Sequence, residues 1–164
     1  MKQTLEIFSK TVARQIELYN TLHALLCAER EALAKQNATA VYDVLGDKEI
    51  VLAEIAAQSE IRVACVRFFA AAFDVAEKDV TLSYMALVSA DRYAIKFAAY
   101  SSAFAEVITR VAELNFRNAM LVKKMFARTK ELSGIIRKAA APVRGLYGAK
   151  GEISEVSSLC SGVA

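Results

Sequence analysis

The chain has 164 residues, of which 55% are hydrophobic and 24% charged, and a single Pro, a composition that excludes an intrinsically disordered chain. Its net charge is only +3, and its basic residues lack the interleaved aromatic residues and the motifs of nucleic-acid-binding proteins, so we expect no nucleic-acid partner. No apolar run reaches about 18 residues, and the N-terminus lacks the apolar core of a signal peptide. Three Cys residues without a CxxC pair suit a reducing compartment. We therefore expect a cytoplasmic protein without stable membrane insertion.

The first half of the chain is predicted to form two long helices. Apolar residues recur every three or four positions over residues 5–33, which predicts a helix over about residues 2–35. Asn37 or Thr39 can cap a second helix, because either side chain can accept a bond from a free backbone N–H. The second helix carries an apolar series that ends near Phe73. One long kinked rod through both segments is the alternative.

A turn is predicted over residues 74–81, with Asp79 as the cap of a short helix and Ser89 or Asp91 as the start of a last long helix. The last helix has the cleanest periodicity, in the series Phe97, Tyr100, Phe104, Val107, Val111, Leu114, Asn118, Leu121, Met125, Arg128, Leu132, Ile135. A seven-residue repeat of this length predicts left-handed, coiled-coil-like packing. The predicted fold class is all-α, with three to four long, antiparallel, coiled-coil-like helices.

Two features of the apolar seams bear on assembly. Phe8, Phe69 and Phe104 are expected to be exposed on their seams, which would favour a homo-oligomer. Asn118 and Arg128 interrupt the seam of the last helix with polar side chains. Such residues either fix the register or the oligomeric state, or they face a partner.

The C-terminal segment has a different composition, with four of the six glycines following the only Pro. We expect a helical domain over residues 1–141 and a partly flexible tail over residues 142–164. Within the tail, Ile153, Val156 and Leu159 have the spacing of one face of a short helix. Such a helix is too short to be stable alone in water, but it could form against an apolar groove. The alternative is a frayed terminus.

Positive charge is concentrated in residues 117–150, which contain nine Lys or Arg residues and one acidic residue, Glu131. This pattern indicates either a basic face for an acidic partner or an ordinary solvated helix face.

The sequence offers no recognisable catalytic or metal-binding motif. His23 is the only histidine, whereas di-iron bundles need two Glu-x-x-His motifs and zinc enzymes use two or three imidazoles. We therefore expect no enzyme, no metal and no cofactor. Histidine phosphotransfer domains resemble His-x-Leu-Lys-Gly around an exposed His, but the run here is His23-Ala24-Leu25-Leu26-Cys27, without the Lys and Gly. Phosphotransfer is kept only as an alternative to a solvated or edge-of-core His.

Four ordered blocks resemble the FlgN-type flagellar export chaperones. That family carries an early E-R-x-A-L block, then K-x-x-L-L, then N-x-x-N-G-x-L, then a Tyr-x-x-x-Gly tail. The corresponding stretches here are Glu29-Arg30-Glu31-Ala32-Leu33, Lys48-Glu49-Ile50-Val51-Leu52, Asn115-Phe116-Arg117-Asn118-Ala119-Met120-Leu121 and Tyr147-Gly148-Ala149-Lys150-Gly151. The resemblance covers most of the chain and lies in its order, because each block alone is common in helices.

The resemblance implies a cytoplasmic, ATP-independent chaperone of the flagellar type III export system. Its clients would be the hook–filament junction (hook-associated) proteins, whose terminal segments are amphipathic helices, and it would also meet components of the export apparatus. The expected groove consists of Leu114, Asn115, Asn118, Leu121, Val122 and Met125. The expected tail residues, which would cover the groove or join the client, are Tyr147, Gly151, Ile153, Val156 and Leu159.

Two alternatives remain open at this point. The six groove residues could instead belong to an ordinary intramolecular core. The whole chain could also be a structural or adaptor coiled-coil protein without a client groove.

Overall fold

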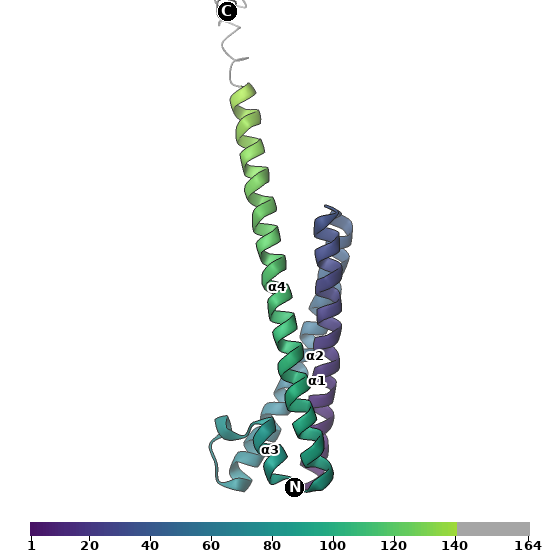
Figure 1. Cartoon of the computed structure of the whole chain (residues 1–164), viewed down its shortest axis with the longest axis vertical. Helices are drawn as coiled ribbons and strands as arrows, with labels where there is room; N and C mark the ends of the chain where they lie inside the picture. Colours follow the sequence, from purple (N-terminus) through teal and green to yellow (C-terminus); the bar gives the residue numbers. More distant parts are fainter. Residues whose placement is uncertain (141–164) are drawn as a thin grey trace, which may run out of the picture. The chain divides into compact units, whose positions relative to one another are not determined.

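The computed structural model describes residues 1–140, which form four α-helices and no strand (Figure 1). The helices are α1 (Lys2–Ala34), α2 (Ala38–Phe73), α3 (Leu82–Val88) and α4 (Asp91–Ala140), with a short 3-10 turn, η1 (Glu77–Asp79), between α2 and α3. The all-α prediction is confirmed. None of the helices in this part of the chain is long and apolar enough to cross a membrane.

The chain divides into two compact units, which we describe separately. The first unit is Met1–Leu121, and the second begins at Val122. α4 continues as one helix through this boundary. The predicted boundary between a helical domain and a tail, at residues 141–142, lies outside the described residues and stays a prediction.

The turn between α1 and α2 explains why they are separate helices. Gln36 adopts the left-handed conformation, with φ 54°, which ends the first helix. Asn37 then caps α2, because its side chain accepts a hydrogen bond of 3.1 Å from the backbone N–H of Ala40. The predicted Asn37 cap is confirmed, and the alternative of a single kinked rod is wrong.

The cap of α3 differs from the predicted one. Asp79 belongs to the 3-10 turn, and the N-cap is Thr81, whose Oγ1 accepts a 3.1 Å bond from the N–H of Tyr84. The prediction of Asp79 was wrong because the extended backbone that precedes a helix occurs at Thr81 and not at Asp79. Ser89 is the C-terminal cap of α3, and α4 begins at Asp91.

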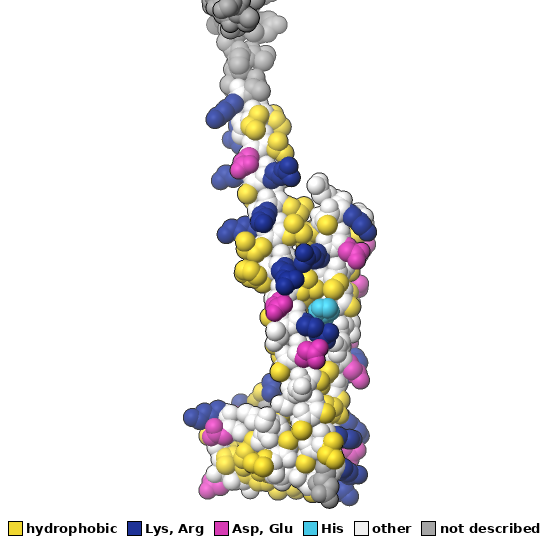
Figure 2. Space-filling view, viewed as in Figure 1, with side chains coloured by type: hydrophobic (Ala, Val, Ile, Leu, Met, Phe, Trp, Pro, Cys, Tyr) yellow, Lys and Arg dark blue, Asp and Glu magenta, His cyan; other side chains and the backbone are white. Residues whose placement is uncertain are grey.

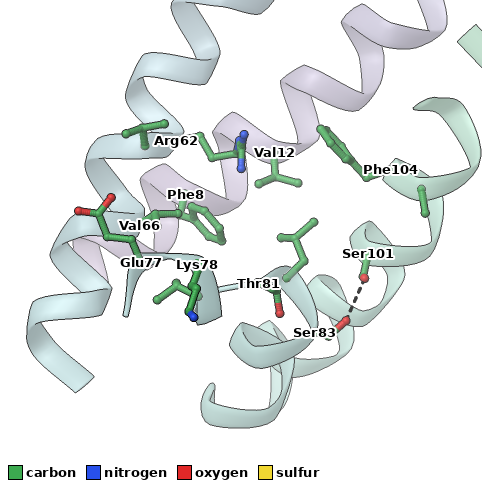
Figure 3. A pocket seen from close by; sticks show the side chains of 14 residues that line it. Phe8, Val12, Arg62, Val66, Glu77, Lys78, Thr81, Ser83, Ser101 and Phe104 are labelled. Carbon is green, nitrogen blue, oxygen red and sulfur yellow. Dashed lines mark hydrogen bonds between the residues drawn. The ribbon is translucent and has the colours of Figure 1, made fainter. Parts of the chain in front are cut away.

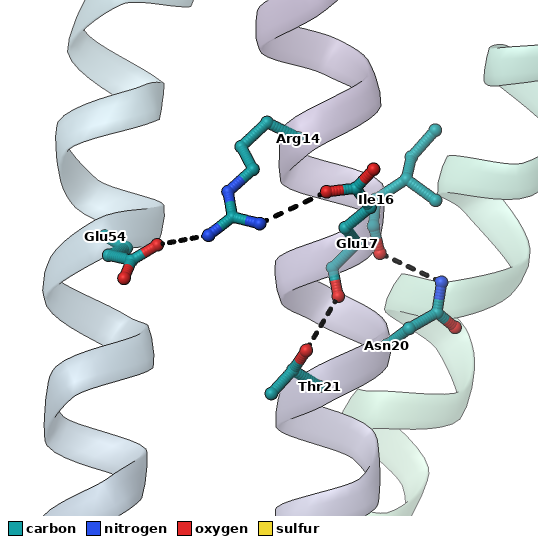
Figure 4. Close-up of polar contacts among 6 residues, drawn as sticks. All are labelled: Arg14, Ile16, Glu17, Asn20, Thr21 and Glu54. Atoms are coloured by element: carbon teal, nitrogen blue, oxygen red, sulfur yellow. Dashed lines mark hydrogen bonds and ion pairs between the residues drawn. The ribbon is translucent and has the colours of Figure 1, made fainter.

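In the first unit, α1 and α2 pack as an antiparallel pair. Arg14 on α1 donates to Glu54 on α2 at 2.8 Å and to Glu17 at 3.2 Å (Figure 4). These two carboxylates raise the pKa of the Arg14 guanidinium. Nearby, the Gln15 side chain donates to Ser59 Oγ at 2.9 Å. Residues near the start of α1 therefore contact residues in the second half of α2, as in an antiparallel pair.

The first part of α4 runs parallel to α1. Successive contacts join Phe8 to Phe97, Tyr19 to Phe104, Asn20 to Arg110, and Leu26 to Asn118. Sequence position rises along both helices through this series. Three long helices in up–down–up order thus build the first unit, and only consecutive long helices are antiparallel.

An aromatic core lies where α3 and the start of α4 cover α1 and α2. Phe8 packs edge-on against Phe69 and Phe97, with ring centroids 5.5 Å apart in both pairs. Phe8 and Phe69 are only 2% and 0% exposed, and Phe104 is partly buried against Tyr19. The expectation that these phenylalanines are exposed seam residues is therefore wrong, because α3 and α4 supply the partner that a second copy was expected to supply.

A second, aliphatic core lies further along α1. It consists of Leu18, Leu22, Leu26 and Ile55, with Val111 and Leu114 of α4 packed against it. Residues of α1, α2 and α4 thus share this second core.

Candidate functional site

The predicted groove residues on α4 fall in both units. In the first unit, Leu114 packs against the aliphatic core and Asn118 is 3% exposed, whereas Asn115 is exposed. Leu121 is partly buried. Leu114 and Asn118 therefore already have partners within the chain.

Asn118 is the centre of a buried polar cluster that joins three helices. Its Nδ2 donates to the backbone carbonyl of Leu26 at 2.8 Å and to Glu29 Oε2 at 2.9 Å. Lys48 Nζ of α2 donates to the other carboxylate oxygen, Glu29 Oε1, at 2.8 Å. A buried charge is tolerated only when it is paired and hydrogen-bonded, and Glu29 has both kinds of partner. We call Glu29, Lys48 and Asn118 the polar cluster.

The polar cluster gives a physical reason for the polar interruption of the α4 seam. The Asn118 side chain fits only where it can reach Leu26 and Glu29, so it specifies one register of α4 against α1. Asn118 Oδ1 is buried and has no hydrogen-bond partner among the described residues, so the observed placement itself carries a desolvation cost that the two Nδ2 bonds offset. Arg128, the other interruption, is exposed.

Sequence reasoning did not bring these three residues together, although a signal was present. Each comes from a different block of the family resemblance, and Glu29 and Asn118 both stand at seam positions where an apolar residue is expected. A carboxylate at one seam position and an amide at another indicate that the two side chains could form a hydrogen bond between the helices. The pairing itself required the offset between α1 and α4, which only the structure supplies.

The described part of the second unit is a helix with an exposed apolar stripe. Val122, Leu132 and Ile136 have exposed side chains, at 55% for Leu132 and 68% for Ile136, and Met125 is partly buried. With 100° per residue, these four residues lie within an arc of about 80°. We call them the α4 stripe. It contains Val122 and Met125 of the predicted groove.

Basic side chains accompany the α4 stripe. Residues 122–138 contain six exposed Lys or Arg residues and one acidic residue: Lys123, Lys124, Arg128, Lys130, Arg137, Lys138 and Glu131. Figure 2 shows Lys and Arg side chains beside hydrophobic ones along this part of α4. The predicted concentration of positive charge therefore lies on the surface, as far as residue 138.

A second concave surface, which sequence analysis missed, lies at the aromatic core of the first unit. Phe8, Val12, Val66 and Phe104 contribute apolar walls, and Arg62, one turn before Val66 on α2, also lines the surface (Figure 3). Arg62 Nε is buried and has no hydrogen-bond partner among residues 1–140. The groove depends on where η1 and α3 lie, and no local sequence pattern indicates that placement.

The described residues do not form a constellation for chemistry. His23 is partly buried on α1, and residues 1–140 contain no group of three His, Cys, Asp or Glu side chains that could hold a metal ion. Burial raises the pKa of the Cys65 thiol, which makes it a poor nucleophile. What the arrangement offers is an exposed apolar surface with positive charge along it. The predicted tail residues Tyr147, Gly151, Ile153, Val156 and Leu159 lie outside the described residues.

The comparisons with known proteins agree with this reading. The chain matches the family described as "FlgN protein" over residues 1–155. Comparisons with curated proteins and with solved structures gave no match. Because the family match covers almost the whole chain and includes every element described above, the chain belongs to the FlgN family of flagellar export chaperones.

Proposed function

We propose that this protein is a cytoplasmic chaperone that holds the amphipathic terminal helices of hook-associated proteins against the α4 stripe before export. The single observation that supports the proposal is the stripe itself. In this member of an export-chaperone family, Val122, Leu132 and Ile136 are exposed on one helix face. A client helix would bury these side chains. Full burial of one such side chain contributes about 1.5–3 kcal/mol, so three or four of them offset much of the entropy cost of association.

The two parts of the predicted groove take different roles in this proposal. Val122 and Met125 begin the client surface, with Asn115 and Leu121 next to it along the helix. Leu114 and Asn118 instead hold α4 against α1, since both are occupied within the first unit. The tail residues Tyr147, Gly151, Ile153, Val156 and Leu159 would cover the stripe in the absence of a client or pack beside the client helix.

The physical logic requires no catalysis. An unpaired amphipathic helix exposes an apolar face and associates with other such faces. A chaperone helix with a complementary stripe removes that face from water by the helix-in-groove mode and releases it again when the client is transferred. Export-apparatus components are the expected recipients of the complex.

The experiment is co-expression of the full chain with hook–filament junction proteins, followed by retention on the tagged chaperone. The test variant is Leu132→Glu/Ile136→Glu, in the stripe. The matched control is Ile50→Glu/Leu87→Glu, which places the same two charges at apolar side chains that are 63% and 83% exposed elsewhere in the chain. We expect wild type and control to retain client and the test variant to lose it. Wild type that retains no client, or a test variant that binds like wild type, would contradict the proposal.

Sedimentation of the chaperone alone separates this proposal from a purely structural coiled coil. The structural alternative predicts a stable oligomer that the Leu132→Glu/Ile136→Glu variant dissociates. The chaperone proposal predicts that client binding competes with any such self-association, so that added client yields a complex with one chaperone chain.

A further inference from the structure

We propose that the segment bound by the α4 stripe is an amphipathic helix with acidic residues along both of its polar flanks. This inference rests on the proposed function, because it specifies the chemistry of the client at the same site. It follows from the charges around the stripe and not from the stripe's apolar character.

The cations of the second unit have no partners in the described part of the chain. None of the six Lys and Arg residues in 122–138 forms a salt bridge with any residue in 1–140. Elsewhere, cations commonly pair with a carboxylate three or four residues away, as Lys10 does with Glu6 at 3.0 Å and Lys35 with Glu31 at 3.7 Å. The sequence of 122–138 supplies only Glu131 for this purpose. Within residues 1–140, the positive charge of 122–138 is therefore not neutralised by neighbouring carboxylates.

The cations also lie on both sides of the stripe. At 100° per residue, Lys124 and Arg128 fall along one side, whereas Lys130 and Arg137 fall along the other. A helix docked on the stripe would present its two flanks to these four side chains. Flanking positions set partner choice in paired helices, where opposite charges attract and like charges repel. Acidic flanks on the client are the complement of this arrangement.

A paired helix fits this surface better than an anionic lipid surface does. Together with Phe126, which is 76% exposed and lies about 40° beyond Val122, the apolar face spans about 120°, close to the width of a helix face that packs against a protein partner. Widening the face on one side to include the exposed Ile135 would bring in Arg128, which lies between Ile135 and Leu132 around the helix. Binding to a lipid surface is the competing outcome of the test.

The test compares two synthetic peptides that bind the full chain, measured by fluorescence anisotropy. Both peptides carry the same apolar heptad positions, and their flanking positions are Glu in one and Lys in the other. We expect the Glu-flanked peptide to bind at least roughly tenfold more tightly at about 50 mM NaCl, with the difference shrinking at about 300 mM because salt screens exposed charges.

Charge-reversal variants test whether the preference for the Glu-flanked peptide arises from the cations beside the stripe. The test variant is Lys124→Glu/Arg128→Glu/Lys130→Glu. The control, Lys2→Glu/Arg30→Glu/Lys96→Glu, makes the same change in net charge at exposed cations that form no salt bridge within residues 1–140. We expect the test variant to lose the preference for the Glu-flanked peptide and the control to keep it. Circular dichroism of both variants must match wild type.

The outcomes separate the two proposals. Hook-associated protein retained by wild type, with equal binding of both peptides, overturns the charge inference and leaves the chaperone function standing. Retention of neither client nor peptide overturns both. The third outcome concerns phosphatidylcholine vesicles that contain about 30% phosphatidylglycerol. If wild type binds these vesicles, the test variant does not, and neither peptide is preferred, the acidic-helix inference is also overturned.

Discussion

Two stretches of the same helix, residues 97–121 and 122–138 of α4, have similar apolar spacing and opposite surroundings. In the first stretch, Phe97 and Val107 are completely buried within the bundle. In the second, Leu132 and Ile136 are exposed. Helical periodicity therefore predicts that a face is apolar, but it does not predict whether the partner of that face belongs to the same chain.

The two helices continue for different numbers of residues beyond the polar cluster. Glu29 and Asn118 meet in the polar cluster, and α1 ends at Ala34, only five residues after Glu29. The described part of α4 reaches Ala140, which is 22 residues after Asn118. The described part of α4 beyond the cluster is therefore longer than the part of α1 beyond it.

The largest expected effect is a difference in stability loss between side-chain truncations in the two stretches. Phe97→Ala removes a buried ring that contacts Phe8, and we expect it to lower the free energy of unfolding by about 3–5 kcal/mol. Ile136→Ala should change it by less than about 0.5 kcal/mol, because the side chain is exposed. Urea unfolding followed by circular dichroism measures both values. Equal losses would show that the stripe is buried in solution.

The polar cluster allows a sharper test of how the first stretch is held. Asn118→Ala and Lys48→Met each remove one partner of Glu29, and we expect each to cost about 1–3 kcal/mol of unfolding free energy. Because both act through Glu29, the double variant should cost less than the sum of the singles. Strict additivity would mean that the three side chains do not form one network.

A stabilising change can separate stability from function. Gln36 adopts φ 54°, a conformation that costs most residues free energy and glycine very little. We expect Gln36→Gly to raise the free energy of unfolding by about 0.5–1 kcal/mol. Client retention should stay unchanged, since the substitution lies in the α1–α2 turn. A drop in client retention would place the turn in the binding surface.

The mildest probe is thiol reactivity, which checks burial without altering the helices. Cys27 is exposed, whereas Cys65 is buried and has a raised pKa. Because a raised pKa leaves less thiolate at pH 8, we expect iodoacetamide to modify Cys27 at least about tenfold faster than Cys65. The assay uses a Cys160→Ser variant and mass spectrometry. Comparable rates at the two sites would indicate that the aromatic core opens readily.

The sequence predicted local structure better than contacts. The first two helices and the Asn37 cap follow from apolar spacing and side-chain chemistry, which act over a few residues. The burial of Phe8 could not be predicted in the same way, because its partners Phe69 and Phe97 are distant in the sequence and contact it only in the tertiary structure. The polar cluster was missed for the same reason.

The candidate site divides in the same way. Val122, Met125 and Leu114 were all predicted as groove residues through the family resemblance. Val122 and Met125 belong to the α4 stripe, whereas Leu114 packs against the bundle's own core. Leu114 and Met125 belong to the same apolar series of α4, and Val122 lies beside it. What separates Leu114 from the other two is that residues of α1 and α2 pack against it, and a repeat within α4 carries no information about contacts with other helices.

Amide hydrogen exchange of the full chain, with and without a hook-associated client, shows whether a client covers residues 122–138. We expect amides of residues 122–138 to exchange quickly in the free chaperone and to be strongly protected in the complex, while those of α1 and of residues 97–118 change little. Strong protection of 122–138 in the free protein, or no added protection with bound client, would contradict this expectation.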